Sequence, residues 1–282
     1  MRNSCTRTQG LLQAIAVYAI FAAILLVCAL QAEGMEATPQ HVLIWKFDDL
    51  RAGAVTKTSG IQDSVKNVAT WAAEQRSPIS LGIICNSLES PLAEDVDWIK
   101  ANAIENGGWI EFWNHGWDHG KVSGPDGKAV SFEFKGTDLA LQIQHLQKSM
   151  RTMRLATGLT FRVFGAPFNA YDESAAQALD ACAELKVWLY GPPSDTRRTV
   201  LLEQIHLEYK TGKVSFEKFM AQYEKLKAPP CLVLQGHPPY WDGESLAAFK
   251  RIAAMLTTDG WIALTPSAYA DSLQHRSRQS TY

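Results

Sequence analysis

The sequence predicts an α/β fold, a distorted (β/α) barrel with about seven strands. From His41 onward, short apolar runs alternate with longer amphipathic segments, which is the pattern of a parallel sheet covered by helices. The chain has 282 residues, 46% of them hydrophobic and 20% charged, enough for one large domain with its own core. At this length a closed or distorted barrel is favoured over an open sheet. Neither GxGxxG nor GxxxxGK[ST] is present in the expected places, which disfavours the nucleotide-binding folds.

Each expected element has its own signal in the sequence. The first two strands are the apolar runs HVLIWKF at 41–47 and ISLGIIC at 79–85, and the third is the aromatic run WIEFW at 109–113. Short apolar runs of this kind are typical of buried strands. After a glycine-rich loop, the segment 138–156 has apolar residues three or four positions apart, which is the spacing of one face of a helix.

The rest of the chain continues the same alternation. Further strands are expected at 161–164, 187–190, 200–207, 231–235 and 261–264, and further helices at 63–75, 92–105, 173–184, 216–226 and 244–256. In such a fold the carboxyl ends of the strands, with the loops that follow them, carry the working residues.

The first 32 residues differ from the rest. A basic start without acidic residues leads into an apolar run at 11–30, and small residues follow at Ala29 and Ala32. This is the order of an export signal, although about 20 apolar residues also suffice for a membrane span. We therefore expect 1–32 to be a signal peptide or an N-terminal membrane anchor, and 33–282 to lie outside the cytoplasm, in the periplasm or the extracellular space.

Charge and cysteine content exclude other classes of protein. The net charge is −2 without basic clusters, so we expect no nucleic-acid partner. Three cysteines lie beyond the N-terminal segment, at Cys85, Cys182 and Cys231, and no CxxC pair occurs. An odd number in apolar surroundings indicates buried free thiols rather than a cysteine zinc site.

Metal-binding residue types follow the first and third strands. Asp48 and Asp49 come directly after the first strand, and His115 and His119 are four positions apart after the third. Two adjacent carboxylates next to a buried strand are costly unless they are used or paired, and imidazole is the commonest metal ligand. The alternatives are a turn or helix cap for the aspartates and two surface histidines on a loop.

Two later strand ends complete the pattern. The expected fourth strand leads into the proline turn GAPFN at 165–169, and the strand at 231–235 leads into GHPPYW, which contains His237. Four strand ends with these residues together indicate a hydrolytic metal site. The aromatic residues Tyr240 and Trp241 follow Pro-Pro and are expected to be exposed, where their rings suit a sugar; the alternative is that they fill the core.

These motifs resemble, in order, those of the polysaccharide deacetylases of carbohydrate esterase family 4, with their NodB homology domain. The resemblance runs from about Val42 to Leu273 and implies a catalytic domain at 33–282 with a distorted (β/α) barrel. Phe47-Asp48-Asp49, the histidine pair, Gly165 to Asn169 and Leu234-Gln235-Gly236-His237 match the family motifs. The roles that the resemblance implies are catalytic base for Asp48, catalytic acid for His237, metal ligands for Asp49, His115 and His119, and groove-lining residues for Pro167, Phe168 and Asn169.

The sequence also departs from the family pattern. Lys46 and Leu50 flank the aspartates where the family has a small hydroxyl residue and glycine, and Gly165 stands where an arginine normally orients the base. Arg162 cannot be assumed to replace that arginine. The Asp-Trp motif of the family has no clear match, with Trp188 as the only candidate.

The expected activity is therefore metal-dependent removal of N-acetyl groups from an amino-sugar polymer or oligomer outside the cytoplasm. A divalent metal, with zinc fitting the histidine-rich set best, would polarise the acetamide and activate water. Carbohydrate is the expected partner, and a membrane only through an N-terminal anchor. The alternatives are hydrolysis of another amide or ester, and an inactive carbohydrate-binding barrel.

Overall fold

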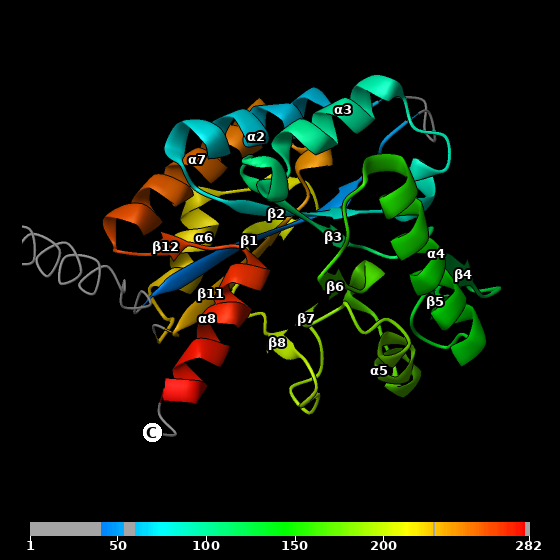
Figure 1. Ribbon diagram of the computed structural model, residues 1–282. Coiled ribbons are helices and arrows are strands. Elements are labelled where there is room, and N and C mark those ends of the chain that lie inside the picture. The colour runs from blue at the N-terminus through cyan, green and yellow to red at the C-terminus, as the bar shows by residue number, and fades with distance from the viewer. Residues whose placement is uncertain (1–40, 54–59, 228, 280–282) are drawn as a thin grey trace, which may run out of the picture. The chain divides into compact units, whose positions relative to one another are not determined.

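The computed structural model describes residues 41–53, 60–227 and 229–279, and its centre is a parallel sheet (Figure 1). Seven strands follow one another in this sheet: β11 (Cys231–Gly236), β1 (Val42–Leu50), β2 (Ile79–Ile83), β3 (Ile110–Asn114), β6 (Val163–Gly165), β7 (Val187–Leu189) and β8 (Thr199–Leu201). The short strand β12 (Ile262–Ala263) pairs with the start of β1. The sheet curls into a nearly closed barrel, which confirms the predicted fold class.

Side chains bridge the seam of the barrel between β8 and β11. In the described part of the chain, no backbone ladder joins these two strands. Instead, the Tyr190 hydroxyl donates a hydrogen bond of 3.2 Å to the carbonyl of Val233. The Val233 amide in turn donates to the side-chain oxygen of Gln204 at 3.1 Å. These two bonds satisfy backbone groups that a neighbouring strand would otherwise bind.

Helices cover the outside of the barrel, as the alternating pattern predicts. They are α2 (Asp63–Gln75), α3 (Ala93–Asn102), α4 (Leu139–Thr157), α5 (Glu173–Asp180), α6 (Phe216–Tyr223), α7 (Gly243–Thr258) and α8 (Pro266–Gln279). In Figure 1, α2, α3 and α7 lie along the side of the sheet that includes β1 and β2. Asp172, Ser215 and Asp242 cap α5, α6 and α7 by accepting backbone N–H bonds, the usual role of these residue types at helix starts.

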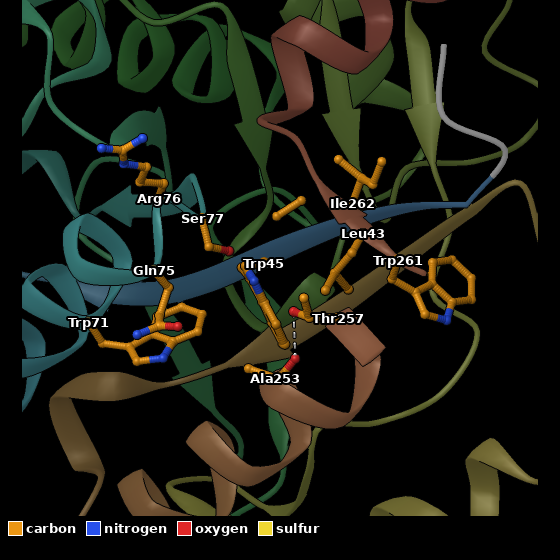
Figure 2. Close-up of a pocket in the computed structure, with 11 residues that line it drawn as sticks. Leu43, Trp45, Trp71, Gln75, Arg76, Ser77, Ala253, Thr257, Trp261 and Ile262 are labelled. Atoms are coloured by element: carbon orange, nitrogen blue, oxygen red, sulfur yellow. Dashed lines mark hydrogen bonds between the residues drawn. The ribbon is translucent and has the colours of Figure 1, made fainter. Parts of the chain in front are cut away.

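Aromatic side chains form the core between β1 and the helices α2 and α7. Trp45 lies 5.1 Å from Phe249 and 6.2 Å from Trp71, measured between ring centroids in edge-on arrangements. Figure 2 shows Trp45 and Trp71 with Leu43 and Trp261 around a pocket of about 210 Å³ where β1 begins and where α2 and α7 end. The amino end of the sheet is therefore lined largely by apolar rings, whereas the site residues lie at its carboxyl end.

Several segments differ from the expected elements. The strand expected at 200–207 ends at Leu201, because the chain leaves the sheet there and returns as the hairpin of β9 (Glu208–Lys210) and β10 (Lys213–Val214). A second hairpin, of β4 (Lys121–Ser123) and β5 (Ala129–Phe132), occupies the expected glycine-rich loop, and α8 was not expected.

The ends of two helices also differ. The expected helix 92–105 breaks at Ala103, whose backbone is extended, and a 3-10 turn, Ile104–Asn106, follows. The expected helix 173–184 ends at Asp180. The spacing of apolar residues in the sequence does not show where a helix breaks in this way.

The export signal or anchor expected at 1–32 lies outside the described residues. Within the described ranges, no helix is both long enough and apolar enough to cross a membrane. Cys85, Cys182 and Cys231 are buried and free, which confirms the prediction of buried thiols.

Candidate active site

The two aspartates lie within β1 rather than after it. The strand continues to Leu50, and its register against β2 shifts between Phe47 and Leu50. Consecutive side chains of a regular strand point to opposite faces. Asp49 adopts a φ of 68°, and this irregularity brings the carboxylates of both Asp48 and Asp49 into one cavity. The expectation that the aspartates follow the end of the strand is therefore wrong, but their proximity to the histidines is confirmed.

Asp49, His115 and His119 form a three-ligand cluster. The Nε2 atoms of both histidines lie 3.2 Å from Oδ1 of Asp49, and the three ligand atoms lie within 4.8 Å of one another. Nδ1 of His115 is within hydrogen-bond distance of the Gly165 carbonyl, at 2.9 Å, which orients the ring so that Nε2 faces the cluster. Three ligands that leave further positions open are typical of a catalytic metal site.

The chemistry of Asp49 fits a divalent cation. Its Oδ1 atom is buried and has no hydrogen-bond partner, so an electron-rich oxygen faces the two imidazoles without a donor. Burial raises the pKa of Asp49, but His115 and His119 beside it lower that pKa well below its ordinary value. The carboxylate is therefore ionised, as a metal ligand must be.

A buried glutamate on the neighbouring hairpin fixes the histidine loop. Glu133 accepts hydrogen bonds from the backbone N–H groups of Trp117 and His119, the latter at 2.9 Å, and lies 2.9 Å from Nδ1 of His145. Asp118, Glu133 and His145 also bring possible ligand atoms together, but both Glu133 oxygens already accept hydrogen bonds. His145 therefore has a structural role here.

Asp48 is held by hydrogen bonds from two side chains. Nζ of Lys46 lies 2.8 and 2.7 Å from its two carboxylate oxygens, and the Gln235 amide donates to Oδ2 at 2.6 Å. Asn169 accepts a bond of 3.4 Å from Lys46 and donates one of 2.9 Å to Gln235. Asp48 is thus a carboxylate in a fixed orientation next to the three-ligand cluster, where it can accept a proton.

His237 is paired with Glu208, a residue that the sequence did not single out. The backbone N–H of His237 donates to Glu208 at 2.7 Å, and Nδ1 lies 2.7 Å from the other carboxylate oxygen. The indole of Trp241 also donates to Glu208. Burial lowers the pKa of His237, but Glu208, Asp48 and Asp49 raise it above its ordinary value. With Nδ1 engaged, Nε2 is the nitrogen available for proton transfer.

These groups share one cavity of about 360 Å³. Its lining residues are Asp48, Asp49, His115, His119, Phe168, Asn169, Thr211, Gln235 and His237. All five predicted catalytic and metal-binding residues thus lie in one place. Thr211 and Gln235 were not expected there, and neither was marked by a sequence pattern of its own.

The predicted substrate-binding residues divide into two groups. Phe168 and Asn169 line the cavity, and Tyr240 is 55% exposed. Pro167 is buried against Gly116. The expected exposure of Trp241 is wrong: it is only 6% exposed, because its ring packs on Phe47 and Phe249 while its indole N–H supports Glu208.

Two residues could have replaced family residues that this sequence lacks: Trp188 for the Asp-Trp motif and Arg162 for the arginine. Neither lines the cavity. Trp188 is fully buried beside Phe164 and Tyr171. Arg162 pairs with the exposed Asp271 at 2.8 Å, so it does not replace the arginine of the family. Lys46 instead places a cation next to Asp48, and it is the one charged residue of the apolar run at 41–47.

No family model and no curated protein match the sequence of this chain. Its structure is similar to a CE4 family pseudoenzyme from Bacillus anthracis, with 11% identity, a TM-score of 0.56 and coverage of 83% of this chain and 66% of that one. This chain thus spans just under two thirds of that protein.

Two further solved structures have the same fold. The peptidoglycan deacetylase PdaC from Bacillus subtilis is 12% identical with a TM-score of 0.55, over 86% of this chain and 96% of that one. A family 4 acetyl xylan esterase from Clostridium thermocellum, in complex with a cobalt ion, is 11% identical with a TM-score of 0.54, over 80% and 89%. The chain therefore has the fold of the carbohydrate esterase family 4 structures, which confirms the resemblance at the level of the fold.

Proposed function

We propose that this protein is a divergent polysaccharide deacetylase that removes N-acetyl groups from an amino-sugar polymer or oligomer outside the cytoplasm. The observation that carries the proposal is the convergence of Asp49, His115 and His119 on one point, with Asp48 and His237 in the same cavity. A metal ion, a carboxylate that does not bind it and a protonated histidine suit the hydrolysis of an unactivated amide.

Asp49, His115 and His119 would hold a divalent metal, for which zinc is the proposed ion. The metal would supply Lewis-acid polarisation of the acetamide carbonyl. Asp48, held by Lys46 and Gln235, would accept a proton from the attacking water. His237 would donate a proton to the leaving amine nitrogen, which does not depart as an anion. Acetate and a free amino sugar would be the products.

The raised pKa of His237 supports an amide substrate, whose leaving amine needs a proton. Its pKa is raised above the ordinary value by Glu208 and the site aspartates, against the effect of burial. It therefore carries its proton over more of the neutral range. Both amide and ester hydrolysis occur among proteins with this fold, so an acetyl ester is the second candidate substrate. Phe168 lines the cavity, and the exposed Tyr240 lies next to His237, with ring centroids 6.4 Å apart. Both rings would contact the sugar.

The third possibility is an inactive sugar-binding barrel, since one protein of this fold is described as a pseudoenzyme. Here all five polar groups share the cavity, which supports an active enzyme. Residues 1–32 have the basic start, apolar run and small residues of an export signal, which supports action outside the cytoplasm, after export or from an N-terminal anchor.

The decisive experiment combines metal content with product release. The purified protein would be analysed for bound metal and then incubated with N-acetylglucosamine oligomers and, separately, with acetylated xylan, with and without chelator. About one metal per chain and chelator-sensitive acetate release from the amino sugar are expected. Release from xylan alone would favour the esterase, and bound metal without any acetate would indicate another substrate. Absence of metal would refute the proposal.

A further inference from the structure

Lys46 is a fully buried cation in the wall of the site. It is 0% exposed, and its ammonium group bonds both oxygens of Asp48 at 2.8 and 2.7 Å. The rings of Trp113 and Tyr190 lie 5.2 and 4.8 Å from Nζ, measured to their centroids. Removing an ammonium group from water is costly, so this arrangement requires compensation from the carboxylate and from both rings.

A purely structural role does not account for the pair well. A buried ion pair is often no more stabilising than apolar side chains of the same volume. Ile44, two positions earlier on the same face of β1, lies in an apolar cluster with Trp113 and Tyr190, so an apolar residue would suit position 46. The position of the pair at the edge of the proposed metal cluster gives a more specific explanation.

The site contains two adjacent carboxylates that both reach the same histidine. Oδ1 of Asp49 lies 3.2 Å from Nε2 of His115, and Oδ2 of Asp48 lies 3.7 Å from that same nitrogen. A small rotation of Asp48 would therefore make it a further metal ligand. In this structure Lys46 and Gln235 both donate to Oδ2 of Asp48, the oxygen nearest His115, whereas Oδ1 of Asp49 has no hydrogen-bond partner.

We propose that Lys46 determines which aspartate binds the metal: it holds Asp48 off the ion and so preserves it as the free base. In this role Lys46 is a positioning residue that stands in for the arginine missing from the proline turn. The inference rests on the proposed metal site, although not on the identity of the substrate.

The proline turn explains why the cation comes from a different strand. A Cβ atom at Gly165, the position of the missing arginine, would lie only 2.7 Å from the ring of Trp113. Real side chains do not approach so closely, so any larger residue there would require Trp113 to move. The ring that fills this space also covers Lys46. The two differences from the family pattern, at positions 46 and 165, are therefore linked: the cation is supplied by β1 instead of the proline turn.

The test uses cobalt(II) as the metal, because its visible absorption reports the number of ligands. Lys46→Met keeps the length of the side chain and removes its charge. We expect Asp48 to join the metal in this variant, so the visible bands of the bound cobalt should weaken as the coordination number rises. Acetate release should fall about 10²–10⁴-fold in kcat, the range for a lost general base, with a smaller effect on KM.

A matched control and a chemical rescue separate positioning from folding. Lys148 also pairs with a carboxylate, Glu89, and lies over a tryptophan ring, that of Trp117, but it is outside the cavity; Lys148→Met should leave the cobalt spectrum and the rate unchanged. In Lys46→Ala, added propylammonium should restore part of the activity and the original spectrum, whereas 1-propanol of the same size should not.

The outcomes distinguish this inference from the proposed function. A changed spectrum in Lys46→Met supports the inference even when the wild-type protein releases no acetate, a result that would count against the deacetylase alone. An unchanged spectrum with a rate within twofold of wild type would overturn the inference. If neither variant folds, a crystal structure of the cobalt-loaded wild-type protein decides the matter: Asp48 bound to Lys46 and away from the ion supports it, and Asp48 bound to the ion refutes it.

Discussion

Replacing Glu208 with glutamine should shift the pH dependence of the proposed deacetylase activity and not merely lower its rate. Glu208 accepts a bond from Nδ1 of His237 at 2.7 Å and raises the pKa of that histidine against the opposing effect of burial. The variant keeps the shape of the side chain but loses the negative charge, so His237 in Glu208→Gln loses its proton at a lower pH than in the wild type. Because the proposed acid, His237, would act in its protonated form, the basic limb of kcat should move to lower pH.

The size of the effect follows from the kind of bond that is lost. A hydrogen bond to a charged group contributes about 1.5–3 kcal/mol, which corresponds to a rate difference of about 10–100-fold. This loss applies on the basic side, where the variant is deprotonated and the wild type is not. At acidic pH both proteins carry the proton, and the difference should shrink to the effect of altered orientation.

Stability should change in the opposite part of the pH range. A histidine whose pKa is raised by folding stabilises the folded state below its ordinary pKa of about 6.5, and this contribution disappears as the pH rises through the raised value. Glu208→Gln should therefore unfold more easily than the wild type at acidic pH and approach it at alkaline pH. Urea unfolding at a series of pH values measures this directly.

The assay is acetate release across the pH range, with Glu203→Gln as the matched control. Glu203 forms the same kind of pair with His206, at 2.8 Å, but on the surface, where such pairs contribute little. Its profile should coincide with that of the wild type. A basic limb of Glu208→Gln that stayed in place or moved to higher pH would show that Glu208 does not hold the proton on His237.

Three further predictions concern the metal, the histidine loop and the substrate. Asp48→Asn should retain the metal and lower kcat about 10²–10⁴-fold. His119→Ala should weaken metal binding by at least about 100-fold, more than the loss of a supporting residue would. Chelator competition measures the metal affinity and acetate release measures kcat, and equal metal loss in both variants would refute the assigned roles. Glu133→Gln should destabilise the protein by about 1.5–3 kcal/mol and weaken metal binding about 10–100-fold. The reason is that the buried Glu133 carboxylate accepts hydrogen bonds from backbone N–H groups of the histidine loop. A melting temperature equal to that of the wild type would count against this. Tyr240→Ala should raise KM for sugar oligomers. It should change the free energy of unfolding by less than about 0.5 kcal/mol, because the Tyr240 side chain is largely exposed. An unchanged KM would show that Tyr240 does not contact the substrate.

The parts of the fold and site that the sequence predicts are those with a local signal. The buried strands are short apolar runs, and Asp48, Asp49, His115 and His119 are recognisable because such polar residues interrupt or follow these runs. The aspartates were nevertheless placed beyond the strand, since nothing local shows that a register shift keeps them within it.

The partners of the acid and the base depend on contacts through space. Glu208 meets His237 from 29 positions away, on a hairpin too short to have a periodic pattern. Lys46 is visible in the sequence as a charge within an apolar strand, but its role requires Trp113 and Tyr190, which come from two other strand ends. The burial of Trp241 likewise depends on Phe47 and Phe249, which pack on its ring from distant parts of the chain.

The left-handed backbone of the site sets a limit on engineering this protein. Of the six non-glycine residues with positive φ in the described ranges, four line the cavity: Asp49, His119, Phe168 and Asn169. Each such conformation costs about 1–3 kcal/mol, and glycine would relieve most of it. A screen for thermostable variants that did not also select for turnover should therefore enrich glycine at these positions. The resulting proteins would be more stable but would lack a proposed metal ligand or sugar contact. Stabilising substitutions that keep the proposed activity are therefore expected in the helices and at the amino end of the barrel.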